Sequence, residues 1–180
     1  MIRIALVLLF TLNVTTPAPA KGARLALYRN TRLGIEFKYP SGWVPEPCRG
    51  AFQAPDCVGF KPKRMKRAEQ DYLLVVSVSG KGLEETVGED GRFQQSEGRW
   101  EMTGRLGAGG EVREVKGRGW EGLFGSAVCG ISVDGAFHGA GGECCAAFLH
   151  RQGRTVKVES DGRVPPDTVL SVVRSFKFLN

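Results

Sequence analysis

The sequence predicts an α+β fold, in which an antiparallel β-sheet carries helices packed on its faces. Short apolar runs rich in β-branched residues recur along the chain, separated by turns rich in glycine; 25 of the 180 residues are glycine. Near the C-terminus the period changes, because Val169, Val172 and Phe176 follow the i, i+3, i+7 spacing of one helix face. The chain shows no internal repeat, so we expect sheet and helices to form one domain.

The N-terminal segment is predicted to be a cleaved secretory signal peptide, residues 1–20. Arg3 supplies positive charge, residues 4–12 are almost entirely apolar, and small residues precede a cleavage site after Ala20. The apolar run is far shorter than the ~20 residues that a membrane-spanning helix needs. A buried N-terminal helix is the alternative. We therefore expect a single mature domain over residues 21–180, without a transmembrane segment, in the periplasm or outside the cell.

Residues 34–39 alternate between apolar and charged side chains, which predicts a half-buried strand. Gly88 and Gly91 weaken the one helix pattern in the middle of the chain. This weak helix is expected at residues 83–95. Before it we expect a linker end or short strand at residues 25–27, a loop at residues 45–59 and a strand rich in β-branched residues at residues 72–78.

The second half of the chain predicts consecutive strands that end in a helix. Pro165 and Pro166 suit the start of that helix, because proline is favoured at the first helical position. Residues 175–178 then predict a short closing strand. The preceding strands are expected at residues 99–105, 111–116, 120–133, 143–150 and 155–160.

The five cysteines predict disulfides, because all lie in the exported part of the chain. Cys48 and Cys57 flank a short loop and form the first expected bridge. A hairpin brings Cys129 opposite Cys144 or Cys145, and only one of these neighbours can face it. We expect the remaining cysteine to be a buried apolar thiol; an intermolecular bridge or a vicinal bond are the alternatives. Zinc is a poor fit, because the chain has no C-x-x-C pair and its two histidines are isolated.

Two segments resemble a known family. Residues 33–43 read LGIEFKYPSGW and residues 169–178 read VLSVVRSFKF, and they resemble the opening strand and the closing helix and strand of PsbP-like proteins. The resemblance implies an α-β-α sandwich around an antiparallel sheet. The family includes an extrinsic photosystem subunit and exported bacterial proteins of unknown function, and its known members mostly bind other proteins. No position here matches a family ligand site, so the resemblance implies neither a cofactor nor a photosynthetic role.

A basic run is the strongest local charge signal in a chain of net charge +6. It can contact phosphates, anionic lipid or an acidic protein surface, and a solvated loop is the simpler interpretation. Nucleic acid is disfavoured by export and by the lack of paired aromatic residues. The basic partner-binding candidates are Lys61, Lys63, Arg64, Lys66 and Arg67.

A second candidate surface is the glycine-rich loop 136–142, which contains Phe137 and His138. An aromatic residue on an exposed loop suits an interface anchor. Folding of Phe137 back onto the sheet is the alternative.

No residue set predicts catalysis. Residues 117–122 fit G-x-G-x-x-G, but a strand follows where a nucleotide site needs a helix. Cys144 and His150 face one side of a strand, yet their backbones lie about 20 Å apart at ~3.3 Å per residue. We therefore expect no enzyme activity and no cofactor.

Three hypotheses for function remain. The first is an exported protein-binding domain, such as an inhibitor or immunity factor that blocks a periplasmic toxin or hydrolase. The second is an accessory factor of an envelope or membrane complex that docks through the basic run. The third is a thiol-dependent enzyme, which requires a reactive free cysteine.

Overall fold

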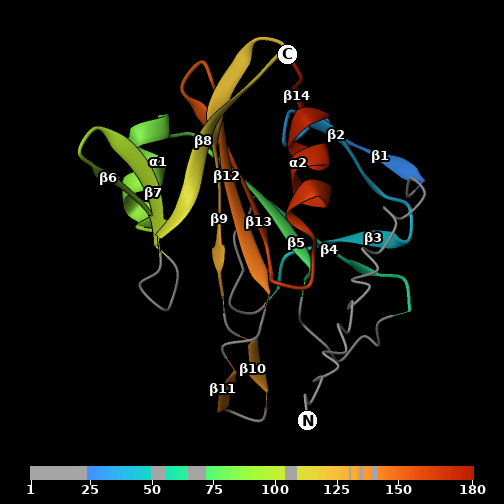
Figure 1. The fold of residues 1–180 in the computed structure, drawn as a ribbon. Coiled ribbons are helices and arrows are strands. Elements are labelled where there is room, and N and C mark those ends of the chain that lie inside the picture. Colours follow the sequence, from blue (N-terminus) through green and yellow to red (C-terminus); the bar gives the residue numbers. More distant parts are fainter. Residues whose placement is uncertain are drawn as a thin grey trace, which may run out of the picture.

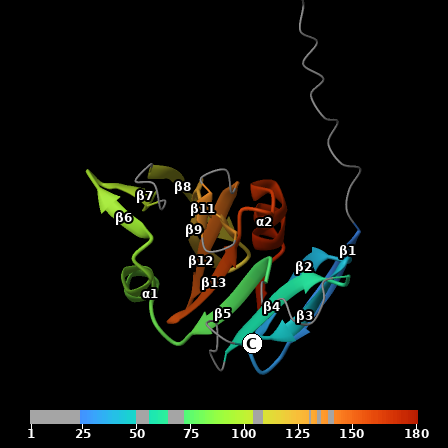
Figure 2. The same ribbon diagram turned by 90° about the horizontal axis from the view of Figure 1, so that it is seen from below.

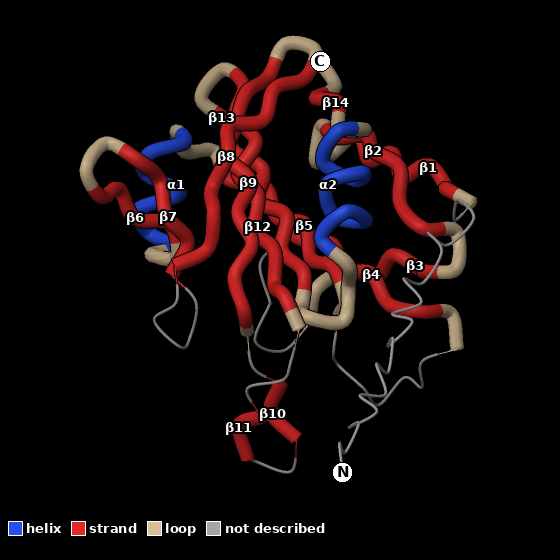
Figure 3. Tube along the Cα trace, viewed as in Figure 1, coloured by secondary structure: helices blue, strands red, loops and turns tan. Residues whose placement is uncertain are grey.

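The computed structural model describes residues 24–49, 56–64, 72–103, 109–129, 131–133, 136–138 and 142–180. Within these residues the chain forms an antiparallel sheet of nine strands, a sheet of three strands, a two-stranded ribbon and two helices. Figures 1 and 3 show the large sheet in the centre, with α2 (Pro166–Arg174) on one side and α1 (Leu83–Asp90) on the other. The α+β class expected from the sequence is therefore correct.

The large sheet is antiparallel throughout its described pairs. Its order is not the order of the chain, because β5 pairs with a strand from the C-terminal half. From edge to edge its strands are β3 (Trp43–Pro47), β4 (Cys57–Pro62), β5 (Leu74–Ser79), β13 (Arg154–Ser160), β12 (Glu143–Arg151), β9 (Trp120–Val128), β8 (Gly109–Gly117), β7 (Arg99–Thr103) and β6 (Phe93–Ser96).

The three-stranded sheet, which we call the small sheet, has β2 (Ile35–Pro40) in its centre. On one side of β2 lies β1 (Leu25–Asn30), and on the other lies β14 (Lys177–Phe178). Figure 2 shows the small sheet beside β3 and β4, at the end of the molecule opposite α1. The small sheet thus joins the first and last described segments of the chain.

Alternation along β12 separates the two hydrophobic cores. Cys145, Ala147 and Leu149 belong to the main core, with α2, the small sheet and β4, β5 and β13. Ala146 and Phe148 point to the other face and belong to a smaller core with α1, β6 and β7. Because neighbouring strand residues point to opposite faces, the two helices cover opposite faces of the central strands.

Two sequence predictions were wrong in their boundaries. Residues 45–59 were expected to form a loop, but β3 and β4 form a hairpin there. Residues 83–95 were expected to form one helix, but α1 ends at Asp90, because Gly91 adopts a left-handed φ of 71° and caps it. The chain then turns back as β6.

The strand expected over residues 120–133 is divided into two. β9 ends at Val128, and a separate two-stranded ribbon pairs β10 (Ile131–Val133) with β11 (Ala136–His138). At the C-terminus, α2 buries Val169, Val172 and Val173, as the helical spacing predicts. None of the helices in the described part of the chain is long and apolar enough to cross a membrane.

Candidate functional site

A groove of about 580 Å³ lies between the end of β1 and the β3–β4 hairpin. One wall comes from Tyr28, Asn30 and the turn that follows β1, and the other comes from β3, β4 and their disulfide. The two walls belong to different sheets. The groove therefore opens where the edge strand of the small sheet passes the edge strand of the large one.

The hairpin wall of the groove is held by three local features. A disulfide joins Cys48 and Cys57, with their Cα atoms 5.5 Å apart. The Tyr72 hydroxyl donates a hydrogen bond of 3.0 Å to the carbonyl oxygen of Pro47. Gly59 permits this arrangement, because a Cβ there would lie 2.3 Å from Cδ1 of the Tyr72 ring. Pro45 and Pro47 are accommodated because β3 is an edge strand.

Polar groups on the β1 wall bond to one another. Nδ2 of Asn30 donates to the Tyr28 hydroxyl at 3.1 Å, and Oδ1 of Asn30 accepts from the backbone N–H of Leu33 at 2.9 Å. Arg32, which also lines the groove, pairs with the exposed Asp56 at 2.8 Å, next to the start of β4. These contacts fix the turn that follows β1.

The register of β1 determines which of its backbone groups face outward. Ser41 N–H donates to the carbonyl of Arg24, which marks that antiparallel pair as hydrogen-bonded. Lys38 N–H turns the other way, to Oγ of Ser175. Hydrogen-bonded pairs alternate along a ladder. Leu25, Leu27 and Arg29 therefore present their N–H and C=O groups to the outer edge, where no strand in the described residues pairs with β1.

Large apolar side chains are exposed on this edge. Leu25 is 48% exposed and Leu27 is 57% exposed, and they lie on the same face of β1 because they are two residues apart. The only other large hydrophobic residue exposed to this extent among the described residues is Val128, at the end of β9. Leu25 and Leu27 therefore form one continuous apolar surface, whereas Val128 lies apart from them on another strand.

Positive charge surrounds the exposed leucines. Arg24 and Arg29 flank them along β1, and Lys38 lies opposite Leu27 on β2. Glu36 is the only acidic residue of β1, β2 and β14. Lys177 hydrogen-bonds Glu36 at 2.8 Å, and Arg29 lies 3.7 Å from it.

The electrostatics of Glu36 reflect this excess of cations. The hydrogen bond from Lys177 lowers the pKa of Glu36 below its ordinary value of 4.5, although partial burial opposes the shift. Arg29 adds a weaker attraction in the same direction. Glu36 is therefore ionised at neutral pH and is shared between two cations.

The predicted basic run does not form one exposed surface in the described residues. Lys61 is 6% exposed, and its Nζ pairs with Glu46 at 2.8 Å inside the β3–β4 hairpin. Lys63 and Arg64 are exposed just after β4. Lys66 and Arg67 lie outside the described residues. Lys61 was therefore a wrong choice as a surface contact, since strand pairing buries the first residue of the run.

The second predicted surface is only partly described. Phe137 and His138 lie in β11, where Phe137 pairs with Ser132 and His138 pairs with Ile131. The predicted signal peptide, residues 1–20, and its cleavage site lie outside the described residues. Both remain predictions.

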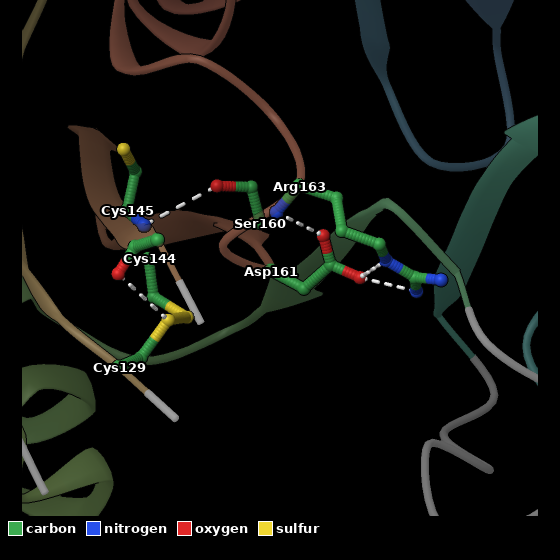
Figure 4. The surroundings of a disulfide bond; sticks show 7 residues. Cys129, Cys144, Cys145, Ser160, Asp161 and Arg163 are labelled. Carbon is green, nitrogen blue, oxygen red and sulfur yellow. Dashed lines mark hydrogen bonds and ion pairs between the residues drawn. A yellow bond between two sulfur atoms is a disulfide. The ribbon is translucent and has the colours of Figure 1, made fainter. Parts of the chain in front are cut away.

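The cysteines follow the expected pattern. Cys48 pairs with Cys57, and of the two possible partners Cys144 takes Cys129, with their Cα atoms 5.6 Å apart. Figure 4 shows the Cys145 sulfur pointing away from that bridge. The Cys145 thiol is buried, and burial raises its pKa to about 11, although Ser160 partly offsets the shift. Such a thiol is a poor nucleophile.

The other features considered for chemistry have structural roles. Residues 117–122 comprise the end of β8, a two-residue turn and the start of β9, and Gly119 in the turn has a φ of 75°. Nδ1 of His150 lies 3.2 Å from Oγ1 of Thr155. No cluster of three or more histidine, cysteine, aspartate or glutamate side chains in the described residues could hold a metal ion.

A half-buried charge cluster ties α1 to β13. Asp90 accepts from Arg92 at 2.6 Å and pairs with Lys157 at 2.5 Å, and both cations also contact Glu159. Burial of Asp90 favours its neutral form, but the hydrogen bonds from Arg92 and Lys157 outweigh it and lower its pKa. Every carboxylate here has a cationic partner, so the cluster fastens the helix to the sheet.

Sequence reasoning did not select β1 as a functional edge. Residues 25–27 were interpreted as the end of a linker or a short strand. Residues 25–28 read Leu-Ala-Leu-Tyr, a short apolar run that suits a strand but does not distinguish its two faces. Which of the two faces is buried depends on the partner sheet.

No protein-family model matches the chain, and no curated protein matches it in sequence. Several solved structures are similar to it in fold, including these two. A crystal structure from Bacteroides thetaiotaomicron VPI-5482 has 8% identity and a TM-score of 0.48; it covers 82% of this chain, which spans 46% of that one. The solution structure of cyanobacterial PsbP (CyanoP) from Synechocystis sp. PCC 6803 has 16% identity and a TM-score of 0.45, covering 92% of this chain and 98% of that one. PsbP is the family that residues 33–43 and 169–178 resemble. Likeness at this level does not extend to function.

Proposed function

We propose that this protein is an exported, non-catalytic binding domain that recognises another protein through the outer edge of β1 and the adjoining groove. The observation that carries the proposal is the exposure of Leu25 and Leu27, at 48% and 57%, on a strand whose outer edge pairs with no other strand in the described residues. Long, flat, apolar strand edges invite pairing with another chain, and folded proteins usually avoid them. An edge of this kind supports a docking surface.

An inhibitor or immunity factor of a periplasmic toxin or hydrolase is the concrete form of this proposal. Two disulfides suit an oxidising compartment, and the N-terminal pattern of residues 1–20 suits export. The buried Cys145 thiol gives little support to a thiol-dependent enzyme. The PsbP-like α-β-α sandwich belongs to the same proposal, supported by helices on opposite faces of β12.

A second candidate is an accessory factor of an envelope complex that docks through the basic run. The observation that favours it is the exposure of Lys63 and Arg64, directly after β4. Binding of this kind depends on long-range attraction and weakens as salt screens the charges. Salt sensitivity therefore separates the two candidates.

Affinity capture tests the proposal. The oxidised chain from Lys21 is immobilised and exposed to envelope and culture extracts, together with two variants. One is the double variant Leu25→Glu, Leu27→Glu, and the control is Val128→Glu, which places the same charge at a residue that is also 48% exposed. We expect one stoichiometric partner, retained at high salt by the wild type and the control and lost by the double variant.

Two results would overturn the proposal. Equal retention by all three proteins would exclude β1 as the docking edge. Retention that disappears at moderate salt, or when Lys63 and Arg64 are changed to glutamine, would favour the accessory factor instead. Circular dichroism of each variant establishes that it is folded before the comparison is made.

A further inference from the structure

We infer that the partner's contacting segment is an extended strand, apolar in its middle and acidic at both ends, that adds to β1 as a fourth strand of the small sheet. This inference rests on the proposed function and specifies the chemistry of its partner. It follows from which backbone groups of β1 face outward, from the order of the side chains along β1 and from the charges around that strand.

The backbone of β1 offers a complete set of hydrogen-bonding groups for one more strand. The ladder to β2 uses Ala26, Tyr28 and Asn30, as the bond from Ser41 N–H to the Arg24 carbonyl requires. Leu25, Leu27 and Arg29 therefore point three N–H and three C=O groups outward. An added strand satisfies these groups without any rearrangement of β2, which is the mode of β-strand addition.

The outer edges of the other strands fit this role less well. β3 contains Pro45 and Pro47, which have no N–H to donate. β14 has only two residues, and β6 has four, of which Gln94, Gln95 and Ser96 are polar. Among the edges in the described residues, β1 combines six residues, no proline and two exposed leucines.

The order of side chains on β1 specifies the middle of the partner strand. Residues beside Leu25 and Leu27 gain by being apolar, because pairing removes both leucines from water. On the opposite face, the partner's side chains lie beside Ala26 and Tyr28, which pack against the main core. Apolar or small residues therefore suit both faces of the central partner segment.

The charges specify its ends. Arg24 precedes the apolar pair, Arg29 follows it, and Lys38 lies across from Leu27 on β2. Their only nearby counter-ion in the small sheet is Glu36, which Lys177 already binds at 2.8 Å. Acidic residues at both ends of the partner strand are therefore attracted, and basic residues are repelled.

The same charges disfavour a second copy of this chain as the occupant. An antiparallel pair of β1 strands brings Arg24 and Arg29 of two molecules to one edge, and each mature chain carries a net charge of +5, because the +6 of the full sequence includes Arg3. A partner with acidic ends relieves this repulsion. A second copy increases it, and self-association is therefore the outcome that the test must separate.

The test uses a synthetic strand and the oxidised, full mature chain. The probe is a capped peptide of about nine residues, with alternating valine and threonine between pairs of glutamates. One control peptide has lysines in place of the glutamates. The other has N-methyl groups on alternate residues, at the backbone amides that would face β1. Amide hydrogen exchange of individual β1 residues is followed by nuclear magnetic resonance, at peptide concentrations up to the millimolar range.

We expect the glutamate peptide to slow exchange at Leu25, Leu27 and Arg29 by about tenfold or more, because their amides become hydrogen-bonded. Ala26 and Tyr28 are already bonded to β2 and should change by less than about twofold. Neither control peptide should slow any of the three outward amides to the same extent.

Three results would overturn the inference. The first is that the glutamate peptide does not slow exchange at the outward amides, and the second is that the lysine peptide slows it equally. The third is slowing that grows with protein concentration in the absence of peptide, which would identify a second copy of this chain as the occupant. If the captured partner still depends on Leu25 and Leu27 while the peptide has no effect, the proposed function stands and strand addition is wrong. If capture does not depend on these leucines, the proposed function is wrong as well.

Discussion

The two outer strands of the small sheet differ although they share one central strand. β14 is two residues long; Lys177 is bound to Glu36, and the carbonyl of Phe178 accepts a hydrogen bond of 3.1 Å from Arg151. β1 is six residues long and exposes Leu25 and Leu27. The edge at β14 is thus short, charged and hydrogen-bonded, whereas the edge at β1 is long, apolar and unpaired on its outer side within the described residues.

The comparison shows that the chemistry of an edge is independent of the core beneath it. Phe37 on β2 contacts the rings of Tyr28 from β1 and of Phe176 next to β14, at 5.1 Å and 5.0 Å between ring centroids. Both edges therefore rest on the same aromatic cluster. Lysine and short length are common means of protecting a strand edge, and β14 has both. Among the described residues, Leu25 and Leu27 belong to none of the hydrophobic core clusters.

The largest effect is expected from removing the shared support. Phe37 is fully buried, so Phe37→Ala should lower the free energy of unfolding by about 3–5 kcal/mol. Urea denaturation measures the change, and Lys38→Ala on the exposed face of the same strand is the matched control. A loss below about 1 kcal/mol would show that the two edges do not depend on this ring.

The next effect concerns the wall opposite β1. Replacing both Cys48 and Cys57 by serine removes a bridge across nine residues of sequence. We expect the free energy of unfolding to fall by about 2–3 kcal/mol, because the unfolded chain gains freedom. Denaturation of the oxidised proteins measures it, and the groove should weaken as a binding surface in parallel. An unchanged midpoint would show that Tyr72 and the strand pairing hold the hairpin without the bridge.

Proline can separate the inner and outer amides of β1. Ala26→Pro removes an N–H that bonds to β2, and should cost about 1–3 kcal/mol of stability. Leu27→Pro removes an outward N–H, and should cost less stability while preventing strand addition. Thermal denaturation and binding to the captured partner are measured for both variants. Equal destabilisation by the two substitutions would contradict the assignment of the Ala26 N–H to β2 and of the Leu27 N–H to the outer edge.

The smallest effect is a dependence of stability on pH. Glu36 lies between Arg29 of β1 and Lys177 of β14, and its pKa in the folded protein is lowered below 4.5, mainly by the hydrogen bond from Lys177. The ionised carboxylate of Glu36 therefore stabilises the fold at pH values above 4.5, the pKa of the unfolded state. This stabilisation is lost as the pH falls through the lower pKa of Glu36 in the folded protein. Glu36→Gln should lower the melting temperature at pH 7, and the difference should shrink progressively as the pH falls below 4.5 and the carboxylate is protonated. A difference that grows on acidification would reverse the sign and contradict the pairing.

Much of the fold could be predicted because its signals are local. The alternation of residues 34–39, the helical spacing from Val169 to Phe176, and the spacing of Cys48 and Cys57 each depend only on neighbouring residues. These features correspond to β2, α2 and the first disulfide. The choice between Cys144 and Cys145 depended on strand register, which required the structure.

The parts that could not be predicted depend on distant partners. Residues 45–59 were expected to form a loop, whereas Pro45 and Pro47 lie in β3, which can contain them because it is an edge strand. Lys61 was expected on the surface, but Glu46 from the facing strand buries and pairs it. For the same reason the open edge of β1 could not be predicted, because it depends on β2 lying on the other side.

The most direct test of the account compares the two edges in one binding experiment. The dissociation constant of the captured partner is measured by calorimetry for the wild type, for Leu25→Glu with Leu27→Glu on β1, and for Lys177→Ala on β14. We predict that the β1 variant binds at least about tenfold more weakly, a loss of about 1.4 kcal/mol, and that the β14 variant stays within about twofold of the wild type. Equal affinities for all three proteins, or a loss confined to Lys177→Ala, would contradict docking at β1.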